Sequence, residues 1–227
     1  MFDLASFSGR LPLFPLPNVV HFPHTLLPLH IFEPRYRRMI GDALEGERVI
    51  GMALLKPGWE SNYDGSPEIH EIACLGEIGR VEHLDDGRYN LVLTGLARVR
   101  VGEIVSPLPY RTARVSLLED RNDLSSWESG LALGAELRRI FLQIYEWLTE
   151  AGGVAPIKPP EAYTLGNVVD IVAGTFDFDV DQKQSLLQEL DVRVRADRLM
   201  SLIRDLARSQ DPLSRRRRTY PPKDGLN

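Results

Sequence analysis

The sequence predicts an α+β protein with a β domain in its first half and a helical bundle in its second half. Residues 10–120 contain short apolar runs with turn residues every eight to twelve positions, the spacing of a small, mostly antiparallel barrel or closed sheet. Residues 127–209 instead repeat apolar residues at helical spacing. Between them lies a polar, turn-rich segment, Glu119–Ser126, which is the expected boundary.

The apolar segment near the N-terminus predicts two short strands. Leu11–Phe32 has no Asp, Glu, Lys or Arg, so a membrane span must be considered first. Five prolines in this segment exclude a spanning helix, because each removes a backbone donor and fixes φ. The segment is therefore expected to form strands at Leu11–Leu16 and Leu26–Ile31.

A first helix is predicted immediately after these strands. Pro34 suits the first turn of a helix, and Glu33 places negative charge at its N-terminus. Gly46 is a plausible end. Apolar residues follow at helical spacing, at Tyr36, Met39, Ile40, Ala43 and Leu44.

The remainder of the β domain is predicted from short apolar runs and turn residues. Asp86 and Gly87 favour a tight hairpin turn, and Gly95 interrupts a strand pattern as a bulge or a close backbone approach would. The residues 56–67 form a loop that carries Trp59 and Tyr63. The expected strands are Val49–Leu55, Ile69–Cys74, Glu77–His83, Tyr89–Thr94, Ala97–Ile104 and a last strand around residues 111–117.

Four helices are predicted in the second half. The first has capping-box spacing at Ser125 and Glu128 and ends at Gly152–Gly153. The others begin at Thr164, at Asp179 with Gln182 as its capping partner, and at Asp191. The chain is thus divided into a β domain, 1–120, a helical subdomain, 121–210, and a basic tail, 211–227, that is expected to be disordered.

Several segments resemble the N-terminal, substrate-binding domain of ATP-dependent Lon proteases. They are LPLFPL, the HIFEPRY of His30–Tyr36, DGRYNLVLTGLARVRV, PYRTARVSLLED and QKQSLLQELDVRVRADRLMSLIRDL. The resemblance covers residues 10–208 and implies a PUA-like pseudo-barrel followed by a helical half. It also implies recognition of unfolded or client polypeptides, and a Lon protease is a further candidate partner.

Composition and missing motifs argue against several other functions. The sequence has no GxxxxGK[ST] loop for nucleotide phosphates and no segment for the Ser/Lys peptidase domain of full-length Lon, so a non-enzymatic recognition module is expected. The net charge of −5 gives no general attraction to nucleic acid or anionic membrane. One cysteine and a start without a signal-peptide pattern favour a cytoplasmic protein.

Clusters of reactive residues favour structural roles over chemistry. His21, His24 and His30 have the wrong spacing for a metal site, and no cysteine is near them in sequence. Cys74 lies about 13 Å along a strand from His70, beyond hydrogen-bond reach, and is expected to be a buried thiol. The acidic pair at 85–86 and the Asp residues 177, 179 and 181 suit turns and helix caps. No catalytic residue, metal or cofactor is expected.

Three functional hypotheses remain. The first is binding of polypeptides or a protein partner through apolar grooves between barrel and bundle and through mobile loops, by edge pairing or hydrophobic contact. Trp59 and Tyr63 are the candidate anchors. The second is RNA binding through the barrel and the basic residues Arg215, Arg216, Arg217 and Arg218. The third, an unrecognised hydrolase, ranks last because no catalytic constellation is present.

Overall fold

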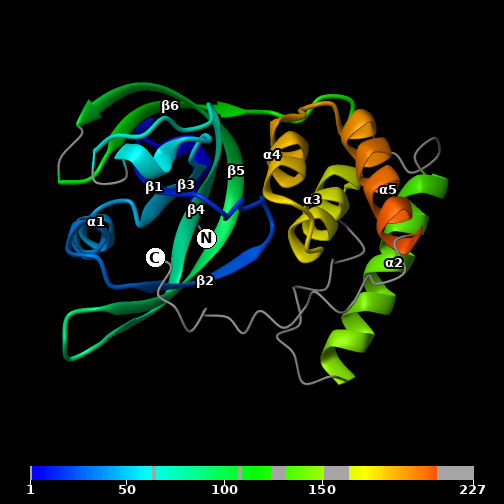
Figure 1. Cartoon of the computed structure of the whole chain (residues 1–227), viewed down its shortest axis with the longest axis horizontal. Helices are drawn as coiled ribbons and strands as arrows, with labels where there is room; N and C mark the ends of the chain where they lie inside the picture. The colour runs from blue at the N-terminus through cyan, green and yellow to red at the C-terminus, as the bar shows by residue number, and fades with distance from the viewer. Residues whose placement is uncertain (1, 63–64, 107–108, 124–130, 151–163, 209–227) are drawn as a thin grey trace. The chain divides into compact units, whose positions relative to one another are not determined.

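The computed structural model describes residues 2–62, 65–106, 109–123, 131–150 and 164–208 of the chain. These residues contain a six-stranded mixed sheet and five α-helices, so the protein is α+β (Figure 1). The chain divides into two compact units, with the division between Leu118 and Glu119. Within the described ranges, no helix is both long enough and apolar enough to cross a bilayer.

Five of the six strands of the first unit form a ring of pairings. The order of all six is β2-β5-β4-β3-β1-β6, and β6 also pairs with β5, which closes the ring of β5, β4, β3, β1 and β6. Strand β2 pairs only with β5 among the described strands. The elements are η1 (Leu4–Ser6), β1 (Arg10–Leu16), β2 (Leu26–Ile31), α1 (Pro34–Glu45), β3 (Val49–Leu54), η2 (Trp59–Asn62), β4 (Ile72–His83), β5 (Tyr89–Ser106) and β6 (Thr112–Leu118).

One strand pair differs from the mostly antiparallel sheet that the sequence predicts. Strands β1 and β3 are parallel, with Leu13 opposite Gly51. The chain between them passes through β2 and α1, which supplies the long crossover that a parallel pair requires. A Cβ on Gly51 would lie 2.7 Å from Leu11 Cδ2, so the glycine permits close packing at this pair.

The predicted separate strands at 69–74 and 77–83 are wrong, because β4 is one continuous strand. Two register shifts, at Leu75/Gly76 and at Ile78/Val81, absorb the irregular residues without a turn. Strand β5 is likewise continuous through Gly95. The expected close approach at Gly95 is confirmed, because a Cβ there would collide with the Phe22 carbonyl oxygen.

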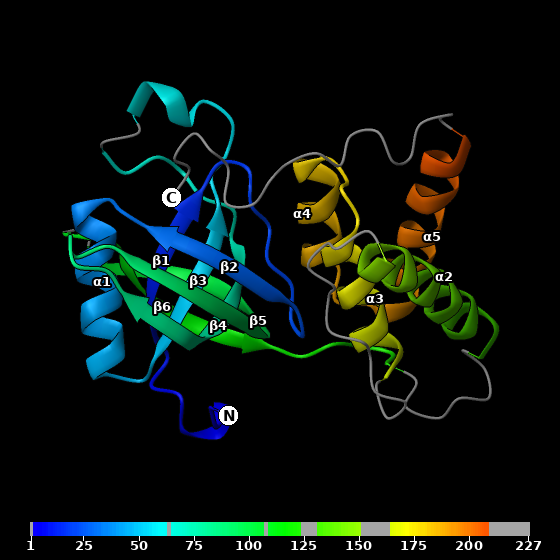
Figure 2. The same ribbon diagram turned by 90° about the horizontal axis from the view of Figure 1, so that it is seen from below.

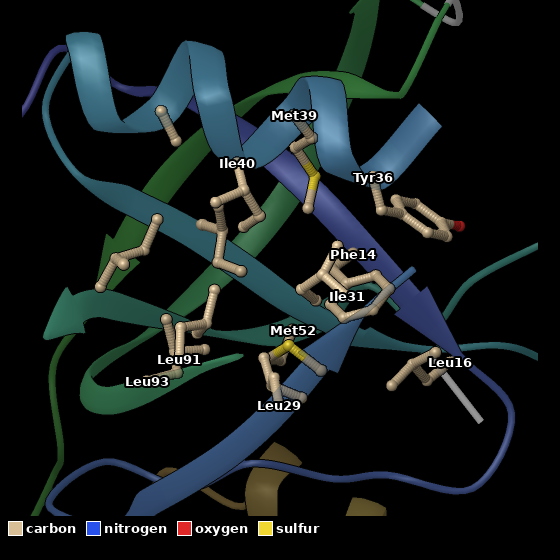
Figure 3. Close-up of a cluster of buried hydrophobic side chains, with 13 residues drawn as sticks. Phe14, Leu16, Leu29, Ile31, Tyr36, Met39, Ile40, Met52, Leu91 and Leu93 are labelled. Carbon is tan, nitrogen blue, oxygen red and sulfur yellow. The ribbon is translucent and has the colours of Figure 1, made fainter. Parts of the chain in front are cut away.

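Helix α1 lies beside the strands of the first unit (Figure 2) and completes its main core. The predicted apolar stripe is confirmed, since Tyr36, Met39, Ile40 and Ala43 are all buried. Figure 3 shows the side chains of Met39 and Ile40 pointing from α1 toward those of the sheet. The other buried members of this cluster are Phe14, Leu16, Leu29, Ile31, Ile50, Met52, Ile78, Leu91 and Leu93.

The second unit contains α2 (Leu131–Glu150), α3 (Leu165–Thr175), α4 (Val180–Gln188) and α5 (Val192–Arg208). Three predicted helix starts are confirmed. The Thr164 hydroxyl accepts from Asn167 N, Gln182 Oε1 accepts from Asp179 N, and Asp191 Oδ1 accepts from Val194 N. The capping box predicted at Ser125 and Glu128 lies outside the described residues.

A buried cation ties this second unit together. The Arg195 side chain is fully buried and donates to Asp120 Oδ1 at 3.0 Å and to the Glu189 carbonyl at 2.7 Å. Its Nε lies 3.2 Å from Asp170 Oδ1, an ion pair without hydrogen-bond alignment. Because a buried charge is costly unless it is paired, these contacts hold α3, α5 and the chain after β6 in one arrangement.

Candidate functional site

The alternation of β2 creates an outer face beside the core. Leu29 and Ile31 are buried, whereas Leu26 is 47% exposed and Pro28 is also exposed. His30, on the same side as Leu26 and Pro28, is half-buried. This pattern follows from the two-residue period of a strand, which turns every second side chain of LLPLHI away from the core.

The outer face continues onto β5 and β4. Pro28 lies opposite Val92, and His30 lies opposite Asn90, which in turn lies opposite Glu82. Between the three strands is a hollow of about 370 Å³, which we call the β2–β5–β4 groove. It is lined by Pro28, Leu29, His30, Arg80, Glu82, Asn90, Leu91 and Val92.

One end of the groove is a chain of hydrogen bonds with a defined direction. Glu82 Oε2 accepts from Asn90 Nδ2 at 3.0 Å, which leaves Asn90 Oδ1 as an acceptor for His30 Nδ1, 2.7 Å away. Arg88 Nη1 lies 3.3 Å from His30 Nε2 and can only donate to it. The network therefore requires the neutral His30 tautomer that carries its proton on Nδ1.

An acidic partner holds Arg88 at this end. Arg88 Nε donates to Asp86 Oδ2 at 2.6 Å, and this hydrogen bond lowers the pKa of Asp86 to about 2. The Asp86 carboxyl is therefore ionised at neutral pH, and it keeps the guanidinium next to His30. The hydrogen-bonding groups of Glu82, Asn90 and His30 thus bond to one another, and the apolar surface of Pro28 and Val92 beside them is open to a ligand.

The free edge of β2 borders the groove. Gly95 N donates to the Thr25 carbonyl at 2.9 Å, so these opposed residues mark a hydrogen-bonded position of the ladder. Because main-chain groups alternate in direction along a strand, those of Thr25, Leu27 and Leu29 point toward β5. Those of Leu26, Pro28 and His30 point away from it. Pro28 has no N–H, so the free edge lacks its central donor.

The candidate anchor Trp59 does not line this groove. Trp59 is half-buried in η2, and Tyr63 lies outside the described residues, as do Arg215, Arg216, Arg217 and Arg218. Their proposed roles in binding stay predictions. Cys74 is confirmed as a fully buried thiol and is out of reach of any substrate.

The three histidines have separate environments. His21 is buried, His24 has a positive φ of 61°, and His30 bonds to Asn90. Across the described ranges, no group of three or more His, Cys, Asp or Glu side chains could hold a metal ion.

The groove cannot be recognised in the sequence because its residues come from three separate strands. The available signals were the alternation in Leu26–Ile31 and in Tyr89–Thr94, each with polar or proline residues on one face. Neither pattern says that β2 pairs with β5. That pairing is what brings His30 to Asn90 and Pro28 to Val92.

Comparisons with known proteins agree on one family. The family model of the ATP-dependent protease La (LON) substrate-binding domain matches residues 10–205. Lon protease 2 of Myxococcus xanthus is 29% identical over 193 residues, which cover 85% of this chain and 23% of that protein. The Lon protease of Anaeromyxobacter dehalogenans is 28% identical over the same length and with the same coverage. The chain thus spans about 23% of the length of the curated relatives it matches.

Solved structures show the same likeness. The crystal structure of a Lon N-terminal domain protein from Xanthomonas campestris has a TM-score of 0.61 and 26% identity, covering 85% of this chain and 97% of that one. The N-terminal domain of the Lon protease from the Mycobacterium avium complex has a TM-score of 0.60 at 17% identity, covering 86% and 98%. The second likeness concerns the fold alone.

Proposed function

This chain belongs to the family of the ATP-dependent protease La (LON) substrate-binding domain, and on that premise we propose that it is a non-catalytic module that recognises polypeptides. The observation that carries the proposal is the β2–β5–β4 groove, an apolar hollow with a self-satisfied polar end. Unfolded or client polypeptides are the proposed ligands, and a Lon protease is a further candidate partner. A cytoplasmic location is proposed on the single, buried thiol of Cys74.

We propose that a bound polypeptide contacts the apolar side chains of the groove. Addition of the polypeptide as a strand at the edge of β2 is the less favoured binding mode. Strand addition depends on main-chain hydrogen bonds along an edge, and Pro28 removes the middle donor from this one. The exposed ring of Pro28, the half-buried Val92 and the exposed Leu26 instead form an apolar strip. Such a strip suits apolar side chains of an extended segment.

The proposal also includes the architecture of the two halves of the chain. The closed ring of strand pairings supports a PUA-like pseudo-barrel for residues 1–120, and the four helices of the second unit support a helical bundle for 121–210. The division of the chain after Leu118 lies close to that boundary. Residues 211–227 are proposed as a separate basic tail.

The test is binding of a labelled, permanently unfolded polypeptide, followed by fluorescence anisotropy. Val92→Glu places a charge in the middle of the apolar strip and is expected to weaken binding about tenfold. Leu117→Glu is the matched control, because Leu117 is 39% exposed on β6 and does not line the groove. It should bind as the unaltered protein does, and thermal melts check that both variants fold.

Two results would count against the proposal. Equal loss of binding in both variants would mean that the groove is not the site. Binding of a single-stranded RNA that weakens steeply with salt, without polypeptide binding, would favour the RNA-binding alternative and lead to deletion of residues 214–227.

A further inference from the structure

A β-bulge places one charged side chain in the groove. Ile78 lies opposite Leu93 and Val81 lies opposite Leu91, so Gly79 and Arg80 together face the single residue Val92. Ile78 is buried, and regular alternation would turn Arg80 toward the core as well. The extra residue instead leaves Gly79 and Arg80 both exposed. Bulges re-aim side chains in this way, and they are frequent beside functional sites.

Arg80 lines the groove and has no charged or hydrogen-bonding partner in the part of the chain that the structure describes. Arg88, by contrast, is held by Asp86. The carboxylate of Glu82 lies on the same strand, but it accepts a hydrogen bond from Asn90 Nδ2. That bond directs Glu82 toward β5 and leaves the Arg80 guanidinium available.

The apolar strip is next to this guanidinium. Pro28, Val92 and Arg80 follow one another across β2, β5 and β4, at strand spacings of about 4.8 Å. Gly79 has no side chain to cover Val92, and a Cβ there would lie 3.2 Å from the Val92 carbonyl oxygen. A ligand side chain on the strip therefore lies one or two strand spacings from Arg80, which is the separation of neighbouring side chains in an extended segment.

We propose that Arg80 selects polypeptide segments that carry an Asp or Glu side chain within two residues of an apolar one. This inference rests on the polypeptide recognition proposed above and names the class of segment that the groove takes. The apolar side chain packs on Pro28 and Val92, and the carboxylate accepts hydrogen bonds from the guanidinium, which is suited to planar, two-point contact. The preference is local to Arg80, since the whole chain carries a net charge of −5.

The experiment compares two labelled peptides that differ only in one Glu or Gln beside an apolar residue. Both are acetylated and amidated, so that no terminal carboxylate can replace the side chain. The unaltered protein is expected to bind the Glu peptide about two- to fivefold more tightly at low salt, as an exposed ion pair allows. The ratio should approach one in high salt and in Arg80→Gln.

Two further variants sharpen the test. Arg114→Gln is the matched control, because Arg114 is an arginine on a strand, β6, that does not line the groove. Its Nε lies 3.6 Å from Glu103 Oε2, so its charge is paired. The Arg114→Gln variant should keep the full preference for the Glu peptide. Glu82→Gln removes the one acidic side chain in the groove lining and should increase that preference.

The outcomes separate the two proposals. Equal affinity of the unaltered protein for both peptides, or a preference that survives in Arg80→Gln, overturns the role of Arg80 and leaves groove binding intact. Failure of both peptides and of the unfolded polypeptide to bind at all overturns the recognition function itself, and this inference with it.

Discussion

Replacing His21 by Gln is expected to make the first unit less sensitive to acid. His21 is 3% exposed, and its burial lowers its pKa to about 3. The Thr25 hydroxyl donates to the Phe22 carbonyl at 2.7 Å, so His21 Nδ1–H donates to Thr25 Oγ1, 3.3 Å away. Nε2 is then unprotonated, and it has no hydrogen-bond partner among the described residues.

The size of the effect follows from proton linkage. An unfolded chain protonates a histidine near pH 6.5, whereas folded His21 stays neutral until about pH 3. Over that interval the unfolded state binds more protons, so the free energy of unfolding falls as the pH falls through 6.5. Between pH 7.5 and pH 5.0 the loss due to His21 is about 2 kcal/mol.

Urea unfolding at the two pH values measures this loss. Trp127→Phe and Trp147→Phe leave Trp59 as the only tryptophan, so that fluorescence reports on the first unit. The protein with His21 should lose about 2 kcal/mol more stability on acidification than His21→Gln does. His83→Gln, which alters an exposed histidine, is the matched control and should behave like the parent. Equal pH dependence with and without His21 would refute the argument.

Three further substitutions test packing and charge pairing. Gly95→Ala should cost about 1–3 kcal/mol in the same assay, because the added Cβ would collide with the Phe22 carbonyl oxygen and displace the segment between β1 and β2 from β5. A stable Gly95→Ala protein would contradict that contact. Asp120→Ala should cost about 3 kcal/mol, measured from the helical circular dichroism signal, because it removes a partner of the buried Arg195. Lys56→Ala, which breaks an exposed ion pair, should cost less than about 1 kcal/mol.

Features that depend on neighbouring residues could be predicted from the sequence. Helix α1 was found from Pro34 and from the apolar spacing after it, and Thr164 and Asp191 marked the starts of two later helices. These signals are local, because a capping side chain bonds to a backbone group two or three residues away. The turn at Gly87, where φ is 81°, was predicted for the same reason.

Features that depend on distant pairing could not be predicted. The parallel pair of β1 and β3 requires knowledge of how the chain crosses over through α1, which no local pattern gives. The sequence predicts two strands, at 69–74 and 77–83, whereas β4 runs through Leu75 and Gly76 with register shifts against β5. As a result, the sequence does not indicate that Arg80 lines the groove. The outward direction of Arg80 follows from the bulge and not from its place in the alternation.

The closed ring of pairings affects how this protein can fold during synthesis. Strand β1 has one edge on β3 and the other on β6, where Leu11 lies opposite Ala113. A ribosome therefore releases β1 long before its second neighbour exists. Until Ala113 has emerged, that edge of the nascent chain is open to wrong partners, including strands of other nascent chains. We expect shielding of the nascent N-terminal segment by a chaperone to improve the yield of folded protein more than shielding of the later helices.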